Sequence, residues 1–453
     1  MKQLLPILAV ISLLAGGCGV YGSYSRPEPD VDVDSLFREP GGDSSSIAEM
    51  PWRELFADTC LQNLVAAALD RNTDLAIARL QVQEAQALLD KARLQYFPSV
   101  TASPQASVSS FDGVVKKTYS LGASASWEVD LPGRLTNAKR GAAASLMERE
   151  AYAASVRSAV VASAAGYYYS LLLLDEELAI SSESLSNWDE TVSVLEALVS
   201  AGRANDVAVR QARASRNALE ASVITLRSDI RSAENGLCAL LKETPHSIER
   251  GTLGSQVFPE TLSAGLPVRM LTTRPDVRQA EAALAVAFYD VNAARAAFYP
   301  SLTLAGSLGW TDSGGGVVTD PGALLLSAVG SLVAPLFNGG TNRANLRIAL
   351  ARQQEALLGF EQALLDAGNE VNDALSLWQT ARERVLLDEL RVDDLEAAVE
   401  KTGLLMRYSS ATYLEVLSAQ QSLLEARRTL AGDRTDMMLA VVGLYRALGG
   451  ASE

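Results

Sequence analysis

Residues 93–100, RLQYFPSV, and residues 295–302, RAAFYPSL, carry the same pattern twice in one chain. Each copy reads arginine, two spacers, two aromatic residues, proline, serine and an aliphatic residue. Both copies end a long segment that is rich in Ala and Leu and free of Gly and Pro. Because a proline ring clashes with the preceding helical turn and lacks an N–H, the sequence predicts a helix that stops at Pro98 and another that stops at Pro300.

The residues after each proline change from helical to period-two alternation. In SVTASPQASVS, residues 99–109, small or apolar side chains alternate with Ser, Thr and Gln, which indicates a strand with one apolar and one polar face. A loop with Asp112 and Gly113 then leads into a second alternating segment. We therefore predict two β-hairpins, with strands at about 98–109, 119–131, 300–310 and 324–336.

The two hairpins divide the chain into an internal repeat. We expect an N-terminal extended segment over 18–50, a first structural repeat over 51–243, a linker over 244–273 that is punctuated by Pro and Gly, and a second repeat over 274–450. Each repeat has the order helix, proline stop, hairpin, helix.

Strands of this length match tilted membrane-spanning β-strands. Tyr119, Trp127 and Trp310 lie near predicted strand ends, where aromatic side chains form interfacial belts. A soluble β-sandwich is the alternative, but the hairpins are separated by nearly two hundred residues of predicted helix. In lipid, unpaired edges of a four-stranded sheet cost on the order of tens of kcal/mol, so other copies must close it. Two copies give eight strands and three give twelve, and strand spacing does not choose between them.

Two very long helices follow the hairpins, at about 135–200 and 341–406. At 1.5 Å per residue the first would extend roughly 100 Å, so it must pack beside equally long neighbours. Each ends at a turn, near 201–206 and 408–415, and the turns share a motif in which Asp206 aligns with Glu415.

The first 17 residues read as a signal peptide, in which Lys2 precedes an apolar stretch and small residues precede Cys18. This arrangement is similar to a bacterial lipoprotein signal and predicts lipidation of Cys18, with an ordinary secretory signal as the alternative. Gly19 after it indicates the outer membrane. Cys60 and Cys238 lie in apolar helical contexts and are predicted to be buried thiols rather than a disulfide.

Composition argues against several classes of function. The net charge of −15 provides no basic surface for nucleic acid. The single histidine, His246, falls in the linker, and we find no metal-ligand spacing, nucleophile elbow or phosphate loop, so we predict no enzyme activity, no cofactor and no metal. A lipid-anchored periplasmic scaffold of coiled coils remains the non-channel alternative.

The whole mature chain resembles the TolC-like outer membrane factors, in particular the lipoprotein branch of OprM and the NodT-type efflux proteins. The resemblance rests on PWRELFADTCLQNLVAAALDRNTDLAIA at 51–78, SWEVDLPGR at 126–134, TTRPDVRQAEAAL at 272–284, the second proline motif and LYRALGG at 444–450. It implies a mainly α fold with a membrane β-barrel: a homotrimer that forms a twelve-stranded β-barrel in outer membrane lipid, continued by a twelve-helix periplasmic α-barrel.

The resemblance also implies a function and partners. The chain would be the exit duct of a tripartite efflux system, receiving substrates from an inner-membrane transporter through a periplasmic adaptor protein; a type I secretion duct is an alternative. The helical turns would be the periplasmic tips. It places adaptor contacts at Gly202, Arg203, Thr412, Tyr413 and Leu414, and gate residues at the tips. The gate residues are Glu415, Ser418, Asp206 and Tyr408.

The gate departs from the family pattern. Relatives narrow the aperture with an acidic pair, whereas here one position is Glu415 and the other is Ser418. We hypothesise that Glu415, repeated three times, forms the main acidic ring and favours cation entry. The alternative is a solvated carboxylate at a helix end, and the tip residues could equally be helix-turn residues, with Gly as a C-cap and Asp or Thr as an N-cap.

Overall fold

The computed structural model describes residues 22–38, 50–257, 274–312, 323–408 and 413–450. The chain divides into two compact units. One comprises residues 1–30, 80–151 and 278–363, and the other comprises residues 31–79, 152–277 and 364–453.

The proline stops act as the sequence predicts. Helix α4 (Thr73–Leu94) ends before Pro98, and strand β1 (Ser99–Phe111) begins directly after it. Helix α8 (Pro275–Ala296) likewise ends before Pro300, and β3 (Ser301–Asp312) begins at the next residue. The first hairpin is completed by β2 (Val114–Val129) and the second by β4 (Ala323–Val333).

Two strand boundaries differ from the prediction. Strand β2 begins at Val114 rather than near 119, because Asp112 and Gly113 both have positive φ, 48° and 76°, and form a two-residue turn that lets pairing start at once. Strand β4 ends at Val333 rather than near 336, before Pro335, which has no N–H to give to a ladder.

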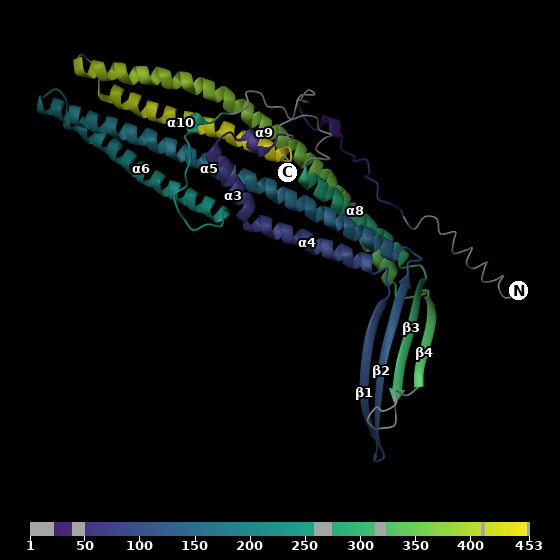
Figure 1. The fold of residues 1–453 in the computed structure, drawn as a ribbon. Coiled ribbons are helices and arrows are strands. Elements are labelled where there is room, and N and C mark those ends of the chain that lie inside the picture. The colour runs from purple at the N-terminus through teal and green to yellow at the C-terminus, as the bar shows by residue number, and fades with distance from the viewer. Residues whose placement is uncertain (1–21, 39–49, 258–273, 313–322, 409–412, 451–453) are drawn as a thin grey trace. The chain divides into compact units, whose positions relative to one another are not determined.

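The four strands form one antiparallel sheet in the order β1-β2-β3-β4 (Figure 1). Strand β2 pairs with β3, so the central seam joins the two repeats. The register keeps the two-faced pattern across the sheet, since Val100 pairs with Ala125, Trp127 with Leu304, and Leu308 with both Ala123 and Leu326. Serines fall on the alternate positions, where Ser124 pairs with Thr101 and Ser307, and Ser307 with Ser327.

A carboxylate corner connects the first hairpin to its long helix. Asp130 accepts hydrogen bonds from the backbone N–H groups of Leu135 (2.9 Å) and Thr136 (2.8 Å), which are free donors at the start of α5 (Arg134–Ser200). Gly133, with a φ of 74°, makes the turn between them. The second repeat has Pro335 in place of the aspartate, and Asn338 precedes the long helix α9 (Thr341–Tyr408) instead.

The second unit is built on two antiparallel helical hairpins (Figure 1). Helix α5 pairs with α6 (Asp206–Leu240), and α9 pairs with α10 (Tyr413–Ala447). With 67 and 68 residues, α5 and α9 are each about 100 Å long. Short elements complete the unit: η1 (Val33–Ser35), α2 (Trp52–Leu55), α3 (Thr59–Arg71) and η3 (Leu253–Ser255).

In the second unit, an aromatic cluster and a buried arginine connect helices that are distant in sequence. The ring of Phe56 lies 6.5 Å from that of Tyr169 and 6.2 Å from that of Tyr445. Arg274, whose side chain is 4% exposed, binds Asp276, Glu370 at 2.8 Å and the carbonyl oxygen of Ala447 near the end of α10. These bonds tie the start of the second repeat to its last helix.

Residues 22–38 are an extended strap rather than a folded domain. In the first unit Arg26 binds Glu281 on α8, and in the second unit Asn372 on α9 donates to the carbonyl oxygen of Leu36 at 2.8 Å. Cys60 and Cys238 are free thiols, as predicted, but only Cys238 is buried and Cys60 is half-buried.

Candidate functional site

The turn between α5 and α6 is fixed by hydrogen bonds at both helix ends. The N–H of Arg203 bonds the carbonyl oxygen of Leu198 at 2.8 Å, and the N–H of Gly202 bonds that of Val199 at 2.9 Å. These two bonds with Gly202 at a φ of 71° make a Schellman C-cap. Helix α6 starts at Asp206, and its N-cap Asn205 accepts a hydrogen bond from the N–H of Ala208 at 3.1 Å.

A hydrophobic cluster, which we call the tip core, fixes the helices behind this turn. It joins α5, α6 and α10 through residues that are at most 7% exposed: Trp188, Leu195, Ala208, Val209, Ala212, Leu219 and Leu417. Tyr413 and Met406 pack against it from the second turn. The α5–α6 turn is therefore backed by a core that also holds the last turns of α9 and the first turn of α10.

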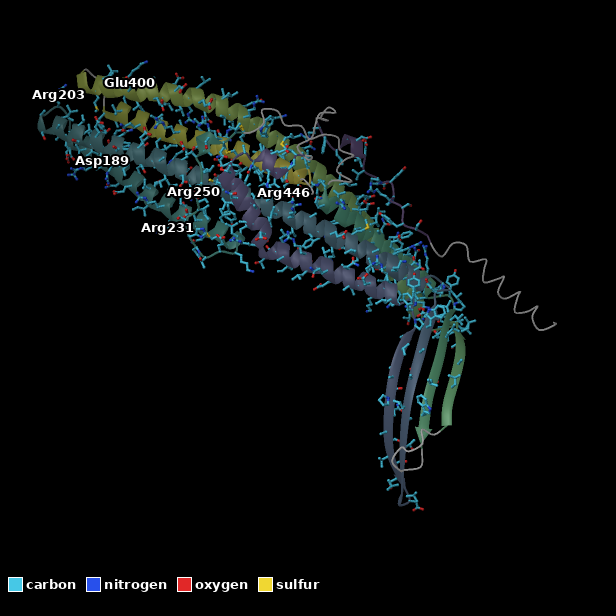
Figure 2. The ribbon with its side chains drawn as sticks, in the orientation of Figure 1. Asp189, Arg203, Arg231, Arg250, Glu400 and Arg446 are labelled. Atoms are coloured by element: carbon cyan, nitrogen blue, oxygen red, sulfur yellow. The ribbon has the colours of Figure 1, made fainter. Side chains whose placement is uncertain are left out.

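Polar bonds surround the tip core. Arg213 on α6 binds Glu196 on α5 at 2.6 Å, and Arg216 binds Asp189 at 2.8 Å. Figure 2 shows Asp189 and Arg203 on the portion of the α5–α6 hairpin that leads to its turn. The net result is a charged exterior around an apolar interior.

The first turn of α10 separates buried from exposed side chains. Val416 and Leu417 are 3% and 7% exposed, and Leu417 is part of the tip core. Leu414, Glu415 and Ser418 are exposed. Because Glu415 and Ser418 are three residues apart on one helix, they lie on the same side of α10. The two predicted gate positions thus share one exposed helix face.

The structure places the other predicted tip residues as follows. Gly202, Arg203 and Asp206 are exposed at the α5–α6 turn, and Asp206 binds Arg210 one turn along α6. Tyr413 is half-buried against the tip core, which gives it a packing role that the sequence did not predict. Cys18 and Thr412 lie outside the described residues, as do the side chains of Tyr119 and Tyr408.

Two residues of the tip were missed. The N-cap of α6 is Asn205, while Asp206, the expected capping residue, is the first helical residue. An asparagine before a helix is a recognised capping signal that could have identified it. Trp188 lies inside the long helix, and its burial depends on distant partners that the local sequence does not specify.

A cavity of about 280 Å³ lies beside the tip core, between α5, α9 and α10. Arg427 crosses it and binds Glu183 at 3.0 Å and Glu396 at 2.6 Å. Burial acts to lower the pKa of the Arg427 guanidinium, but the hydrogen bonds to Glu396 and Glu183 outweigh burial and leave the pKa raised. The cavity is therefore a charge-paired, water-accessible gap between helices.

The sheet exposes its apolar face. Leu326 is 79% exposed and Leu308 is 36% exposed, and the two residues pair across β3 and β4. Trp127 and Trp310, two of the predicted belt residues, are 39% and 37% exposed, and the indole N–H of Trp127 bonds the carbonyl oxygen of Tyr96 at 2.9 Å. An uncovered apolar sheet face indicates a surface that contacts lipid or another chain.

Among the described residues, none of the helices combines the length and hydrophobicity needed to span a lipid bilayer.

Comparisons with known proteins agree with this architecture. Residues 64–242 and 266–450 match the family described as outer membrane efflux protein. The chain is 29% identical over 454 residues to the cation efflux system protein CusC of Escherichia coli strain K12, covering 99% of each chain. It is 28% identical over 460 residues to the probable outer membrane lipoprotein SilC of Salmonella typhimurium, again covering 99% of each chain.

Solved structures show the same fold. The open state of the MtrE outer membrane channel of Neisseria gonorrhoeae matches with a TM-score of 0.87 and 27% identity, covering 96% of this chain and 99% of that one. The outer-membrane channel OprN matches with a TM-score of 0.87 and 28% identity, covering 96% and 100%. The predicted TolC-like fold is confirmed, and so is the predicted function as an efflux channel rather than an enzyme. The chain belongs to the outer membrane efflux protein family, and it is an outer membrane efflux channel that extends into the periplasm.

Proposed function

We propose that three copies of the chain join their sheets edge to edge and form a twelve-stranded pore through the outer membrane, continued by their long helices into the periplasm. The observation that supports this most is the open, two-faced sheet. Among the described residues β1 and β4 each pair on one side only, and the face bearing Leu308 and Leu326 is uncovered. In hydrocarbon, unpaired strand edges are too costly to persist, so they need partners.

Native mass spectrometry of the full chain in detergent tests the assembly, with trimers as the expected species. Conductance in planar bilayers tests the pore. A monomer, or a trimer that leaves bilayers insulating, would contradict the proposal.

The exposed tip surface is proposed to dock a periplasmic adaptor, which links the duct to an inner-membrane transporter. Gly202 and Arg203 are exposed at the turn between α5 and α6, and these two helices pack on the tip core. We expect Arg203→Glu to reduce the amount of adaptor that co-purifies. Arg231→Glu is the matched control, since Arg231 is exposed on α6 but far from the turn (Figure 2). Equal loss with both variants would argue against docking at the tip.

Glu415 is proposed to set the charge of the periplasmic aperture. It lies on the exposed side of α10 together with Ser418. A three-fold ring of carboxylates attracts cations and repels anions. Single-channel recordings should show lower cation selectivity for Glu415→Gln and higher selectivity for Ser418→Asp, which adds a second ring on the same face. If neither variant alters selectivity, Glu415 is only a solvated helix-end residue.

Cys18 is proposed to carry the lipid anchor. The relative SilC is itself named a lipoprotein. Cys18→Ala should abolish incorporation of labelled palmitate, while the protein stays in the outer membrane fraction because its strands also hold it there. Release of the variant into the periplasm would instead indicate a scaffold held only by lipid.

A further inference from the structure

Helix α10 carries a buried carboxyl group, Asp433, that the channel function does not use. The residue is 2% exposed, and its Oδ1 atom accepts from Nη2 of Arg384 on α9 at 2.6 Å. Its Oδ2 atom is buried and receives no hydrogen bond from any donor group among the described residues. A buried carboxylate oxygen without a partner is unfavourable, which calls for a group that satisfies it.

A second carboxyl group supplies that partner. Asp388 lies four residues after Arg384 on α9, so both side chains project from the same face of the helix. Its side chain is 14% exposed, it lies one helical turn from the arginine that contacts Asp433, and a hydrogen bond with it raises the pKa of Asp433. Two carboxylates have only acceptor atoms, so a hydrogen bond between them requires a proton on one of the two.

The surrounding charges favour that proton. Arg384 offsets one negative charge, and Arg391 lies 3.6 Å from Asp388, beyond a normal hydrogen bond. Asp436, exposed on α10, adds a further negative charge. Burial raises the pKa of Asp433 most, and the hydrogen bond to Asp388 adds to it, giving a value of about 6 despite Arg384.

A metal ion is the other possible occupant of an acidic cluster. Within the described part of the chain, however, His, Cys, Asp and Glu side chains nowhere form a group of three or more that could hold one. A shared proton needs only two facing carboxylate oxygens. The site therefore suits a proton rather than a metal ion.

We propose that Asp388 and Asp433 share one proton and that this carboxyl pair is a pH-sensitive clasp between α9 and α10. In acid the shared proton bonds the two helices together. When it is lost, two negative charges face each other in a site with little water, and the helices are held less firmly. The tip residue Glu415 belongs to the same helical hairpin, so loosening of the clasp acts on the hairpin that carries the aperture.

The direction of the pH effect follows from proton binding. An aspartate in the unfolded chain has a pKa of about 4, whereas the folded value for Asp433 is about 6. Between these two values the folded state binds more protons than the unfolded state. The contribution of the pair to stability therefore decreases as the pH rises through this window and is lost above about pH 6.

Thermal unfolding of the full chain in detergent, measured from pH 4.5 to 8, tests the clasp. Asp433→Asn mimics the protonated group, so its Tm should exceed that of the unmodified protein by an amount that grows from pH 4.5 to about pH 6 and reaches several degrees at pH 7.5. Asp388→Asn should show the same pH dependence of Tm as Asp433→Asn. The double variant should have a Tm no higher than that of either single variant. Asp394→Asn, at an exposed carboxyl on the same helix, is the control and should follow the unmodified protein.

The opposite sign would overturn the proposal. If Asp433→Asn has a lower Tm than the unmodified protein at pH 7.5, Asp433 acts as the ionised partner of Arg384 and shares no proton. A second measurement does not depend on folding of the variants. Infrared spectra of the protein labelled with ¹³C-aspartate should show a protonated carboxyl band that disappears near pH 6. Absence of such a band at pH 5 would likewise reject the clasp.

Discussion

Gln420 on α10 donates a hydrogen bond to Thr191 on α5, with 2.9 Å between Nε2 and Oγ1. Thr191 in turn donates to the carbonyl oxygen of Asn187. This chain of bonds joins the two repeats beside the tip core. It connects α5 directly to α10, although 229 positions of sequence separate Thr191 from Gln420.

Removing this bond should loosen the tip. Gln420→Ala is expected to cost about 1 kcal/mol, the net value of one such hydrogen bond. Amide hydrogen exchange in the first turns of α10 should become faster. Gln421→Ala is the control, because Gln421 is exposed and its bond to Ser215 is longer, at 3.3 Å. Equal exchange rates in both variants would mean that Gln420 does not hold the helices together.

The turn glycine should resist substitution for a backbone reason alone. No heavy atom lies within 4 Å of a Cβ added at Gly202, but its φ is 71°. Gly202→Ala should therefore cost about 1 kcal/mol of stability from the left-handed conformation. Gly166→Ala, also unobstructed but within helix α5, should stabilise by about 0.5–1 kcal/mol. Opposite shifts in Tm are expected, and shifts of the same sign would contradict the C-cap assignment.

The buried arginine of the second unit should be indispensable. Arg274→Met leaves the Ala447 carbonyl without its donor and removes the cation that Asp276 and Glu370 bind; because these two carboxylates are each 45% exposed, we expect a loss of about 1.5–3 kcal/mol in thermal unfolding. Arg446→Met is the control, since Arg446 is 56% exposed and 3.9 Å from Glu370, and should cost at most about 1 kcal/mol. A mild effect of Arg274→Met would show that the C-terminal helix is held by packing alone.

Two neighbouring residues on β3 should differ in how well they tolerate a charged substitution. Leu308→Arg places a guanidinium on the apolar face, which costs about 2–4 kcal/mol in mid-bilayer. Ser307→Arg places it on the serine-bearing face and should be tolerated. The amount of each variant in the outer membrane fraction reports the difference. Equal loss of both would show that the apolar face does not meet lipid.

The sequence predicted the elements that depend on local chemistry. Pro98 and Pro300 determine where β1 and β3 begin, since a proline affects its own immediate neighbours. The early start of β2 was missed although the Asp112–Gly113 pair signals a tight hairpin, because the two lysines that follow break the apolar alternation. The position of the turn determines where strand pairing begins. The alternation of polar and apolar residues is a weaker indicator of that boundary.

Partners distant in sequence explain the remaining differences at the tip. Val207 and Val416 occupy equivalent places in the shared motif, yet Val207 is 54% exposed and Val416 is 3% exposed. The repeat therefore identifies both turns but not which side chains face inward. The direction in which these side chains face depends on which helices surround each turn. Trp188 is likewise buried by residues of α6 and α10, which are distant in sequence.

The hairpin turn at Asp112 and Gly113 also has a consequence outside the sheet. Pairing between β2 and β3 starts at Tyr119 and Asp312, so residues 114–118 of β2 have only β1 beside them within the described residues. At about 3.4 Å per residue this is a two-stranded prong of about 17 Å. A short peptide tag inserted at its end would be displayed clear of the sheet below, which makes the prong a natural handle for labelling the protein on intact cells.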